Sequence, residues 1–381
     1  MRDTHWVGTW ASSPVPVEGV AVRGQTLRMI ARASIGGGTL RVRLSNAYGD
    51  GRLAIGAARI ALRESGAGIV PGSDRRLTFG GAGSAAVPAG ALLVSDPVAL
   101  DVPPLADLAI SLHLPGAVAE SFRVTGHGNA HQTSYISPPG DFTAAVALPV
   151  SRETDSWLFV SGIDVVAPDG AAGVVAFGDS LTDGNLTTLD ANARWPDRLA
   201  RRLCARRGGR TVAVMNHGIG GNRILHDLRG DSGLRRFDRD VLAQTGATHV
   251  IVLLGINDIR NRRGLAQEIV TADEMIAGLA QLAARARLRG LKVFGGTLLP
   301  FEKETFFPAA WTPGGEARRQ AVNAWIRTGG AFDAVIDFEA ALRDPAHPTR
   351  LLPDYDCGDH LHPSDRGYAA MGDAIDLALF D

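Results

Sequence analysis

The apolar positions of the sequence change their period part-way along the chain. From Thr26 to about Val166 apolar residues mostly alternate with polar ones, most clearly in 40–44 and 108–114. Alternation with period two is typical of half-buried β-strands, and Gly, Pro, Asn and Asp residues separate these runs. The pattern therefore predicts an antiparallel β-sandwich for the first part of the chain.

In the second part, short β-branched runs alternate with helical stretches. The clearest helix has a capping box at Thr271 and Glu274 and an expected stop at Gly290. Other helices are expected to begin at Pro196, near Gly315 and at Ser364. Five parallel strands are predicted, at 174–177, 211–215, 248–254, 291–298 and 332–338. This order of elements indicates a doubly wound α/β domain, which binds ligands beyond the carboxyl ends of its strands.

The stretch 167–173, rich in Gly and Pro, is the expected boundary between a domain at 1–167 and another at 168–381. The 381-residue chain has 39 basic and 40 acidic residues, a formal net charge of −1, and the basic residues are spread along it. This distribution argues against a nucleic-acid partner. Only Lys292 and Lys303 are lysine, and neither has a motif that would support Schiff-base chemistry.

The two cysteines, Cys204 and Cys357, cannot form a disulfide framework, although one bridge or two free thiols remain open. No apolar run reaches the roughly 18 residues of a membrane span, and Met1–Trp10 lacks the apolar segment of a secretory signal. As written the chain is expected in the cytoplasm, or outside the cell if a signal peptide was removed. The oligomeric state stays open.

Four predicted strand ends carry residues suited to catalysis. Ser180 follows the first strand, the glycine-rich segment 216–222 follows the second, and Asn257 follows the third. Asp359 and His362 follow the fifth. Because the carboxyl ends of parallel strands meet at one edge of a sheet, these residues are expected to lie together.

Together these residues supply what a serine acyl-transfer site needs. An imidazole can take the proton of a serine near neutral pH, and a carboxylate can orient the ring. We therefore predict Ser180 as nucleophile, His362 as base and Asp359 as its partner. The backbone N–H groups of Ser180 and Gly221 and the side-chain amide of Asn257 are the expected oxyanion hole.

In these segments the sequence resembles the SGNH hydrolases, also called the GDSL esterase and lipase family. Ser180 lies in the family's first block, Gly178-Asp179-Ser180-Leu181, and Asn257 lies in its third. Its last block, Asp-x-x-His, falls on 359–362, and the glycine of its second falls on Gly221, with Gly220 adjacent. The resemblance covers about 174–381. It implies a flavodoxin-like sheet of five parallel strands and ester hydrolysis by a Ser-His-Asp triad, with no cofactor.

The first part of the chain resembles a bacterial branch in which a β-sandwich precedes the SGNH domain and which is likened to xylan esterases. The likeness rests on 10–14, 45–50 and 194–197. The family as a whole acts on acetylated sugars, short aryl and alkyl esters, phospholipids and thioesters. The resemblance therefore favours a small-molecule or carbohydrate ester with a short acyl group, especially acetyl, without naming the alcohol.

Aromatic residues offer two further interpretations. Trp6 and Trp10 could form a sugar-stacking platform in a carbohydrate-binding domain, although core packing is favoured for them. The long loop after the fourth predicted strand carries the expected substrate-binding residues Phe301, Phe306, Phe307 and Trp311.

A metal-dependent hydrolase is the rival to the serine mechanism. Carboxylate, thiol and imidazole groups cluster near the end of the chain and could hold zinc. They are Asp356, Cys357, Asp359, His360 and His362. This interpretation leaves Ser180, Gly221 and Asn257 without a role, so no metal is expected.

Overall fold

The computed structural model describes residues 5–118, 123–261 and 264–381, which divide into two compact units. The first unit is Met1–Ala171 with Leu189–Asn192. The second is Ala172–Thr188 with Ala193–Asp381. The chain thus passes from one unit to the other between Ala171 and Ala172, and a short segment far along the sequence belongs to the first.

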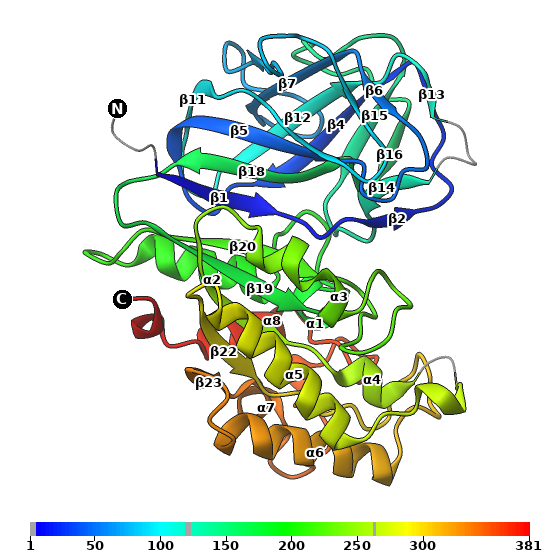
Figure 1. Cartoon of the computed structure of the whole chain (residues 1–381), viewed down its shortest axis with the longest axis vertical. Coiled ribbons are helices and arrows are strands. Elements are labelled where there is room, and N and C mark those ends of the chain that lie inside the picture. Colours follow the sequence, from blue (N-terminus) through cyan, green and yellow to red (C-terminus); the bar gives the residue numbers. More distant parts are fainter. Residues whose placement is uncertain (1–4, 119–122, 262–263) are drawn as a thin grey trace. The chain divides into compact units, whose positions relative to one another are not determined.

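The first unit is built of antiparallel strands (Figure 1). They are β1 (Trp6–Ala11), β2 (Val15–Val17), β3 (Val22–Arg23), β4 (Gln25–Arg32), β5 (Gly37–Ser45), β6 (Leu53–Ile55), β7 (Ala57–Leu62), β8 (Arg75–Arg76), β9 (Ala85–Val87), β10 (Leu92–Val94), β11 (Val98–Val102), β12 (Asp107–His113), β13 (Ala117–Val118), β14 (Val124–His127), β15 (Ser134–Pro139), β16 (Arg152–Thr154), β17 (Trp157–Leu158) and β18 (Val160–Val166). One large sheet has the order β1-β18-β5-β10, with β11 also on β5, and the other has the order β16-β15-β4-β12-β7-β8. Smaller sheets are β17-β14-β2, β13-β3 and β6-β9. The predicted antiparallel β domain is confirmed.

Alternation along the strands explains burial in the first half of β5, but not at Arg43 and Ser45 of that strand, which are buried, nor in β12. Leu40, Val42 and Leu44 of β5 are fully buried, as predicted. In β12 both faces are buried, including Ala109 and Ser111, so the prediction of a half-buried strand is wrong there. Ala109 lies in a second apolar cluster on that face, with Ile30, Ala61, Ile69, Tyr135 and Leu148. Ser111 is tolerated in the interior because its Oγ accepts a hydrogen bond from Arg28 (2.9 Å).

Trp10 belongs to the core of the first unit. It is 8% exposed, and its ring meets that of Trp157 edge-on at 4.9 Å between centroids. Trp6 lies under the guanidinium of Arg41, 4.5 Å from its ring centroid. With Trp10 buried, the pair does not form a sugar-stacking platform in this structure.

The segment Leu189–Asn192 is held in the first unit by the carboxylate of Asp190. Asp190 accepts hydrogen bonds from the Gln132 amide (2.5 Å) and from both the backbone N–H and the hydroxyl of Thr133 (2.6 and 2.7 Å). Hydrogen bonds to an ionised acceptor are stronger than those between neutral groups. The carboxylate of Asp190 therefore contributes to the placement of this segment, together with the Asp190 N–H, which bonds to the His131 carbonyl (3.1 Å).

The second unit contains five parallel strands in the order β20-β19-β21-β22-β23. They are β19 (Ala172–Gly178), β20 (Val212–Gly218), β21 (Ala247–Leu253), β22 (Lys292–Gly296) and β23 (Ala334–Ile336). Numbered within the unit, this is the order 2-1-3-4-5 of flavodoxin-like sheets. The predicted flavodoxin-like fold is confirmed.

The helices of the second unit are α1 (Ser180–Asp183), α2 (Trp195–Ala205), α3 (Gly233–Phe237), α4 (Ile256–Arg260), α5 (Ala272–Arg287), α6 (Pro313–Thr328), α7 (Phe338–Leu342) and α8 (Asp365–Asp373). Four of them, α2, α5, α6 and α8, begin within about two residues of the positions that the sequence predicted. Thr271 and Glu274 form the predicted capping box at the start of α5. At its end, Gly290 has φ +71°, its N–H bonds to the Arg287 carbonyl and the next N–H bonds to that of Ala286, which is a Schellman stop.

Two groups of helices cover the sheet of the second unit. α5 packs against β22 and α6, and Figure 1 shows it in front of the sheet. α2 packs against β20 and α8. No helix in the described part of the chain is long and apolar enough to cross a membrane. Cys204 and Cys357 are both free thiols.

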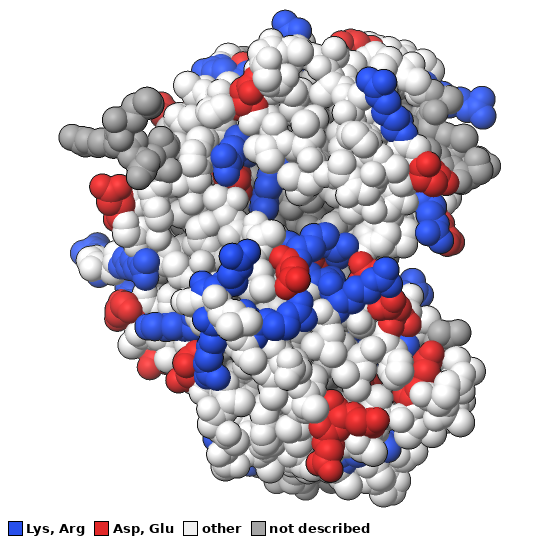
Figure 2. All heavy atoms as spheres, viewed as in Figure 1, with Lys and Arg blue, Asp and Glu red and all other residues white. Residues whose placement is uncertain are grey.

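Charged side chains on the surface of the second unit lie largely in ion pairs. Arg235 pairs with Asp227 (2.8 Å) and Arg285 pairs with Asp238 (2.6 Å). On the face drawn in Figure 2, acidic groups lie among the basic ones. Exposed pairs of this kind stabilise a fold by about 0–1 kcal/mol each, so this surface contributes little to the free energy of folding.

Candidate active site

Ser180 is placed at the carboxyl end of the sheet by a tight turn. β19 ends at Gly178, and a Cβ there would lie 2.4 Å from the Leu253 carbonyl oxygen and 2.2 Å from the Thr182 hydroxyl, so only glycine fits. Asp179 then caps α1, because its Oδ1 accepts the N–H of Leu181 (3.0 Å). Ser180 is the first residue of α1 and is 4% exposed.

A continuous chain of hydrogen bonds joins Ser180, His362 and Asp359. His362 Nε2 lies 2.9 Å from Ser180 Oγ, and its Nδ1 lies 2.6 Å from Asp359 Oδ2. An ionised carboxylate only accepts hydrogen bonds, so Nδ1 donates to Asp359, and Nε2 is the ring atom placed to accept from the serine hydroxyl. The three groups predicted from spacing are therefore in contact, although Ser180 and His362 are 182 positions apart.

Asp359 is held in its ionised form. Burial would raise the pKa of this carboxyl, but the His362 ring and the N–H groups of His362 (2.7 Å) and Leu361 (2.9 Å) outweigh burial and lower the pKa to about 2. His360, the neighbouring histidine, bonds to a different carboxylate and lies outside the hydrogen-bond chain of Ser180, His362 and Asp359. Its Nδ1 lies 2.5 Å from Asp356 Oδ2.

The glycine segment after β20 separates the roles of Gly220 and Gly221. The Gly220 N–H is already bound to the Asp183 carboxylate (3.1 Å). Gly221 has φ +78°, which favours glycine, and none of the described residues accepts its N–H. The N–H of Ile219 bonds to the Gly178 carbonyl (3.2 Å), so this segment lies beside the turn that carries Ser180. This geometry agrees with the choice of Gly221 as the predicted oxyanion donor.

Asn257 lies in α4, one residue after the helix begins, and is 1% exposed. One N–H of its amide bonds to the Asn222 carbonyl (3.1 Å), the residue that follows Gly221. Its Oδ1 accepts from Arg260 Nη1 (2.8 Å). The amide thus has one N–H engaged by the glycine segment and a second one to offer.

Two more carboxyl groups are buried near Ser180. Burial raises the pKa of Asp179 to about 7. Burial also raises the pKa of Asp258 to about 6, against the opposing effect of the Ile224 and Leu225 N–H groups that it accepts (2.8 and 3.2 Å). Desolvation therefore dominates at both carboxyls.

The aromatic residues of the loop after β22 lie in different environments. Phe306 is 51% exposed, and its ring meets the His362 ring edge-on at 5.9 Å. Phe307 is partly exposed beside the Arg260 guanidinium (5.8 Å). Trp311 is half-buried, whereas Phe301 is fully buried and has no surface to offer a substrate in this conformation. Phe306 is the one of the four that directly contacts the hydrogen-bonded histidine.

The side chains of the cluster that could hold a metal already have other roles: the carboxylates accept hydrogen bonds, and the thiol is held protonated. Side-chain ligand atoms of Asp356, Cys357 and Asp359 lie within 4.8 Å of one another. However, the carboxylate of Asp356 accepts bonds from 358 and 360, and that of Asp359 from 361 and 362. Burial raises the pKa of the Cys357 thiol to about 12, whereas metal ligation needs a thiolate. These residues fit a metal poorly.

Sequence reasoning missed three residues that support the site. Asp183 accepts the Gly220 N–H through its carboxylate (3.1 Å). Arg260 and Glu304, which form an ion pair (2.6 Å), were not considered. The i, i+3 spacing of Asn257 and Arg260 on a short helix was the available signal, whereas nothing in the sequence connects Glu304 to either.

A flavodoxin-like sheet thus carries a buried serine, histidine and aspartate in one hydrogen-bond chain at its edge. Residues 176–370 match the GDSL-like Lipase/Acylhydrolase family. Because the match spans more than half of the 381 residues, the chain belongs to this family, and it is a carboxylic ester hydrolase. No curated protein matches the chain significantly.

Solved structures that resemble this chain include three that each cover about half of it. A catalytic mutant of Axe2, an acetylxylan esterase from Geobacillus stearothermophilus, is 20% identical, with 53% of this chain and 91% of that chain covered and a TM-score of 0.41. Est24, a carbohydrate acetylesterase from Sinorhizobium meliloti, is 17% identical, with 53% and 95% covered and a TM-score of 0.40. A GDSL-like lipase from Bacteroides thetaiotaomicron is 20% identical, with 54% and 87% covered and a TM-score of 0.40.

Proposed function

We propose that the chain hydrolyses esters through an acyl-enzyme on Ser180, with His362 as general base and Asp359 as the group that orients its ring. The observation that carries the proposal is the hydrogen-bond chain from Asp359 through His362 to Ser180 (2.6 and 2.9 Å). A serine hydroxyl is a weak nucleophile until a base takes its proton, and here the base is within reach.

In the first step Ser180 Oγ attacks the carbonyl carbon while its proton moves to His362 Nε2. The tetrahedral intermediate then collapses, the bond to the alcohol oxygen breaks, and His362 gives the proton to the leaving alcohol. In the second step a water molecule loses a proton to His362 and attacks the acyl-enzyme. The carboxylic acid leaves, and the proton returns to Ser180. Asp359 stays ionised throughout and stabilises the imidazolium.

The oxyanion of both intermediates would be bound by the N–H groups of Ser180 and Gly221 and by the second N–H of the Asn257 amide. Donors of this kind are effective because they are fixed before charge develops on the carbonyl oxygen. The tight turn at Ser180 and the hydrogen bonds of Asn257 at both ends of its amide support this role.

The proposed substrates are short-acyl esters, acetyl esters first, of a small or carbohydrate alcohol. The acetyl group follows the sequence resemblance to xylan esterases. The position of Phe306 bears on the alcohol, because the alcohol takes its proton from His362 and therefore leaves on the side where this exposed ring lies (5.9 Å). An aromatic ring at that point suits an aryl or sugar leaving group.

The test compares the wild-type chain with Ser180→Ala and with Ser232→Ala, a buried serine of the same unit without a proposed role. Hydrolysis of p-nitrophenyl esters of increasing acyl length and of acetylated xylan is measured, together with labelling by a fluorophosphonate. We expect Ser180→Ala alone to lose turnover and label, and acetyl esters to react fastest. Normal turnover by purified Ser180→Ala would refute the proposal.

A further inference from the structure

The amide of Asn257 is fixed at both ends, and one of those ends depends on Arg260. A guanidinium only donates hydrogen bonds, so Arg260 Nη1 at 2.8 Å requires the oxygen of the amide, not its nitrogen. The nitrogen is thereby turned to the Asn222 carbonyl (3.1 Å). Without a donor at its oxygen, the amide would be held at one end only, by its N–H to the Asn222 carbonyl, and its orientation would be less fixed.

Arg260 is itself held by Glu304. The two side chains are 3% and 0% exposed, and Arg260 Nε lies 2.6 Å from Glu304 Oε2. Among the described residues no aligned hydrogen bond reaches either oxygen of Glu304, so the ion pair with Arg260 is what compensates its charge. Because a buried charge without a partner is strongly destabilising, each residue keeps the other in place.

Glu304 comes from the loop between β22 and α6, and its two successors contact the other half of the site. The N–H of Thr305 bonds to the Asp359 carbonyl (3.0 Å), and the ring of Phe306 meets that of His362. Three consecutive residues thus contact three parts of the site. The first pairs with Arg260, the second bonds to the backbone of Asp359, and the third packs against the His362 ring. This loop therefore connects the ion pair of Arg260 and Glu304 to the hydrogen-bond chain that contains Ser180.

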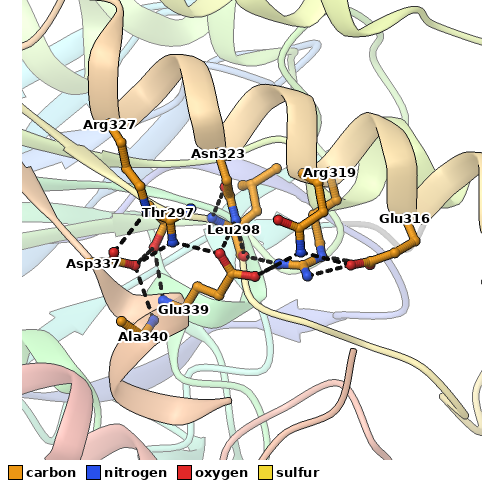
Figure 3. Close-up of polar contacts among 10 residues, drawn as sticks. Thr297, Leu298, Glu316, Arg319, Asn323, Arg327, Asp337, Glu339 and Ala340 are labelled. Carbon is orange, nitrogen blue, oxygen red and sulfur yellow. Dashed lines mark hydrogen bonds and ion pairs between the residues drawn. The ribbon is translucent and has the colours of Figure 1, made fainter. Parts of the chain in front are cut away.

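A buried network fixes the start of that loop (Figure 3). Both backbone groups of Leu298 are bound, the N–H by Asn323 Oδ1 (2.7 Å) and the carbonyl by Asn323 Nδ2 (2.9 Å) and Arg319 (2.8 Å). Glu339, fully buried, accepts from Arg319 (2.7 Å) and Asn323 (3.0 Å). The loop therefore leaves the sheet from an anchored position.

We infer that Arg260, held by Glu304, is a positioning residue that keeps the amide of Asn257 turned with a donor toward the oxyanion. The inference rests on the proposed function, because it assigns Arg260 a task only if Asn257 binds the oxyanion. It adds Arg260 and Glu304 to the residues on which the proposed reaction depends.

A double-mutant cycle tests the inference. Arg260→Met is made together with Glu304→Gln, so that no buried charge is stranded, with and without Asn257→Ala, and kcat and KM are measured for p-nitrophenyl acetate. Loss of one oxyanion donor costs about 10²–10³ in kcat, so we expect that loss for Asn257→Ala. Arg260→Met with Glu304→Gln should lower kcat by about tenfold or more, with KM nearly unchanged. In the Asn257→Ala background the same two substitutions should lower kcat by less than about twofold.

Other outcomes separate the possible failures. Equal losses in both backgrounds, or an effect confined to KM, would overturn the inference while leaving the oxyanion role of Asn257 intact. Unchanged kcat in Asn257→Ala would overturn that role and the inference with it. Arg260→Lys, which can still donate to Asn257 and pair with Glu304, should recover much of kcat, whereas no recovery at unchanged thermal stability counts against positioning.

Discussion

Replacing Asp179 by asparagine should stabilise the chain, and the gain should grow with pH. The side chain is 1% exposed and its pKa is raised to about 7 from the ordinary 3.8, first by burial and also by Asp258, while Arg260 and the Leu181 N–H oppose the shift. The folded state therefore keeps a proton that the unfolded state loses between pH 4 and pH 7. Stability is fully present below about pH 4 and falls as the pH rises through the folded pKa.

The magnitude follows from the distance between the assay pH and that pKa. From pH 5 up to the folded pKa of about 7, the carboxyl is ionised in the unfolded state only. Each of these two pH units lowers the free energy of unfolding by about 1.36 kcal/mol, so the wild-type chain loses roughly 3 kcal/mol of stability between pH 5 and pH 8. Asparagine cannot ionise, and its oxygen can still cap α1 through the Leu181 N–H (3.0 Å). The advantage of Asp179→Asn should thus be larger at pH 8 than at pH 5 by that amount.

Urea unfolding at the two pH values measures this difference. The matched control is Asp354→Asn, because the Asp354 side chain is 73% exposed and pairs with the equally exposed Arg366. We expect the control to show little change at either pH. If the difference between Asp179→Asn and wild type is the same at pH 5 and pH 8, burial does not govern the ionisation of Asp179.

Three further predictions concern the site and its support. Gly220→Ala should keep most of the activity, since a Cβ there meets nothing closer than 3.9 Å. Gly221→Ala should lose activity, because alanine is strained at the φ of +78° that this position adopts. Ester hydrolysis by the two purified variants tests the difference. Asp359→Asn should lower kcat by about 10⁴, because the amide stabilises neither the tautomer nor the imidazolium, and a loss below tenfold would contradict the role. Glu339→Gln should destabilise the fold by about 1–3 kcal/mol, since the buried Arg319 guanidinium loses one of its two carboxylate partners and keeps Glu316 (2.7 Å), and unchanged urea unfolding would contradict this.

Local chemistry predicted much of the fold. Thr271, Glu274 and Gly290 mark both ends of α5, because caps bond within a few residues of the chain. The β-branched runs became the five strands because most of their residues are buried in a parallel sheet, although Val335 of β23 is exposed. The spacing of Asp359 and His362 placed one bond of the hydrogen-bond chain, since a carboxylate three residues before an imidazole can reach its Nδ1.

The remainder depends on contacts between distant segments. Alternation could not foretell that Ser111 is buried, because Arg28 and a separate apolar cluster cover its face. The family's spacing selects Gly221 over the adjacent Gly220, but the physical difference between them is a distant contact, because Asp183 occupies the N–H of Gly220. The partner of Arg260 lies 44 positions away in a loop, at Glu304, and no periodicity records such a pairing.

Trapping the acyl-enzyme tests the central claim most directly. The wild-type chain is mixed with p-nitrophenyl acetate, quenched in acid within the first turnover, digested and examined by mass spectrometry, with Ser232→Ala and His362→Ala treated in parallel. We predict an acetyl group on Ser180 in the wild-type and Ser232→Ala chains and none in His362→Ala. Rapid ester hydrolysis with the acetyl group on another residue, or with unmodified Ser180 at every quench time, would contradict the account.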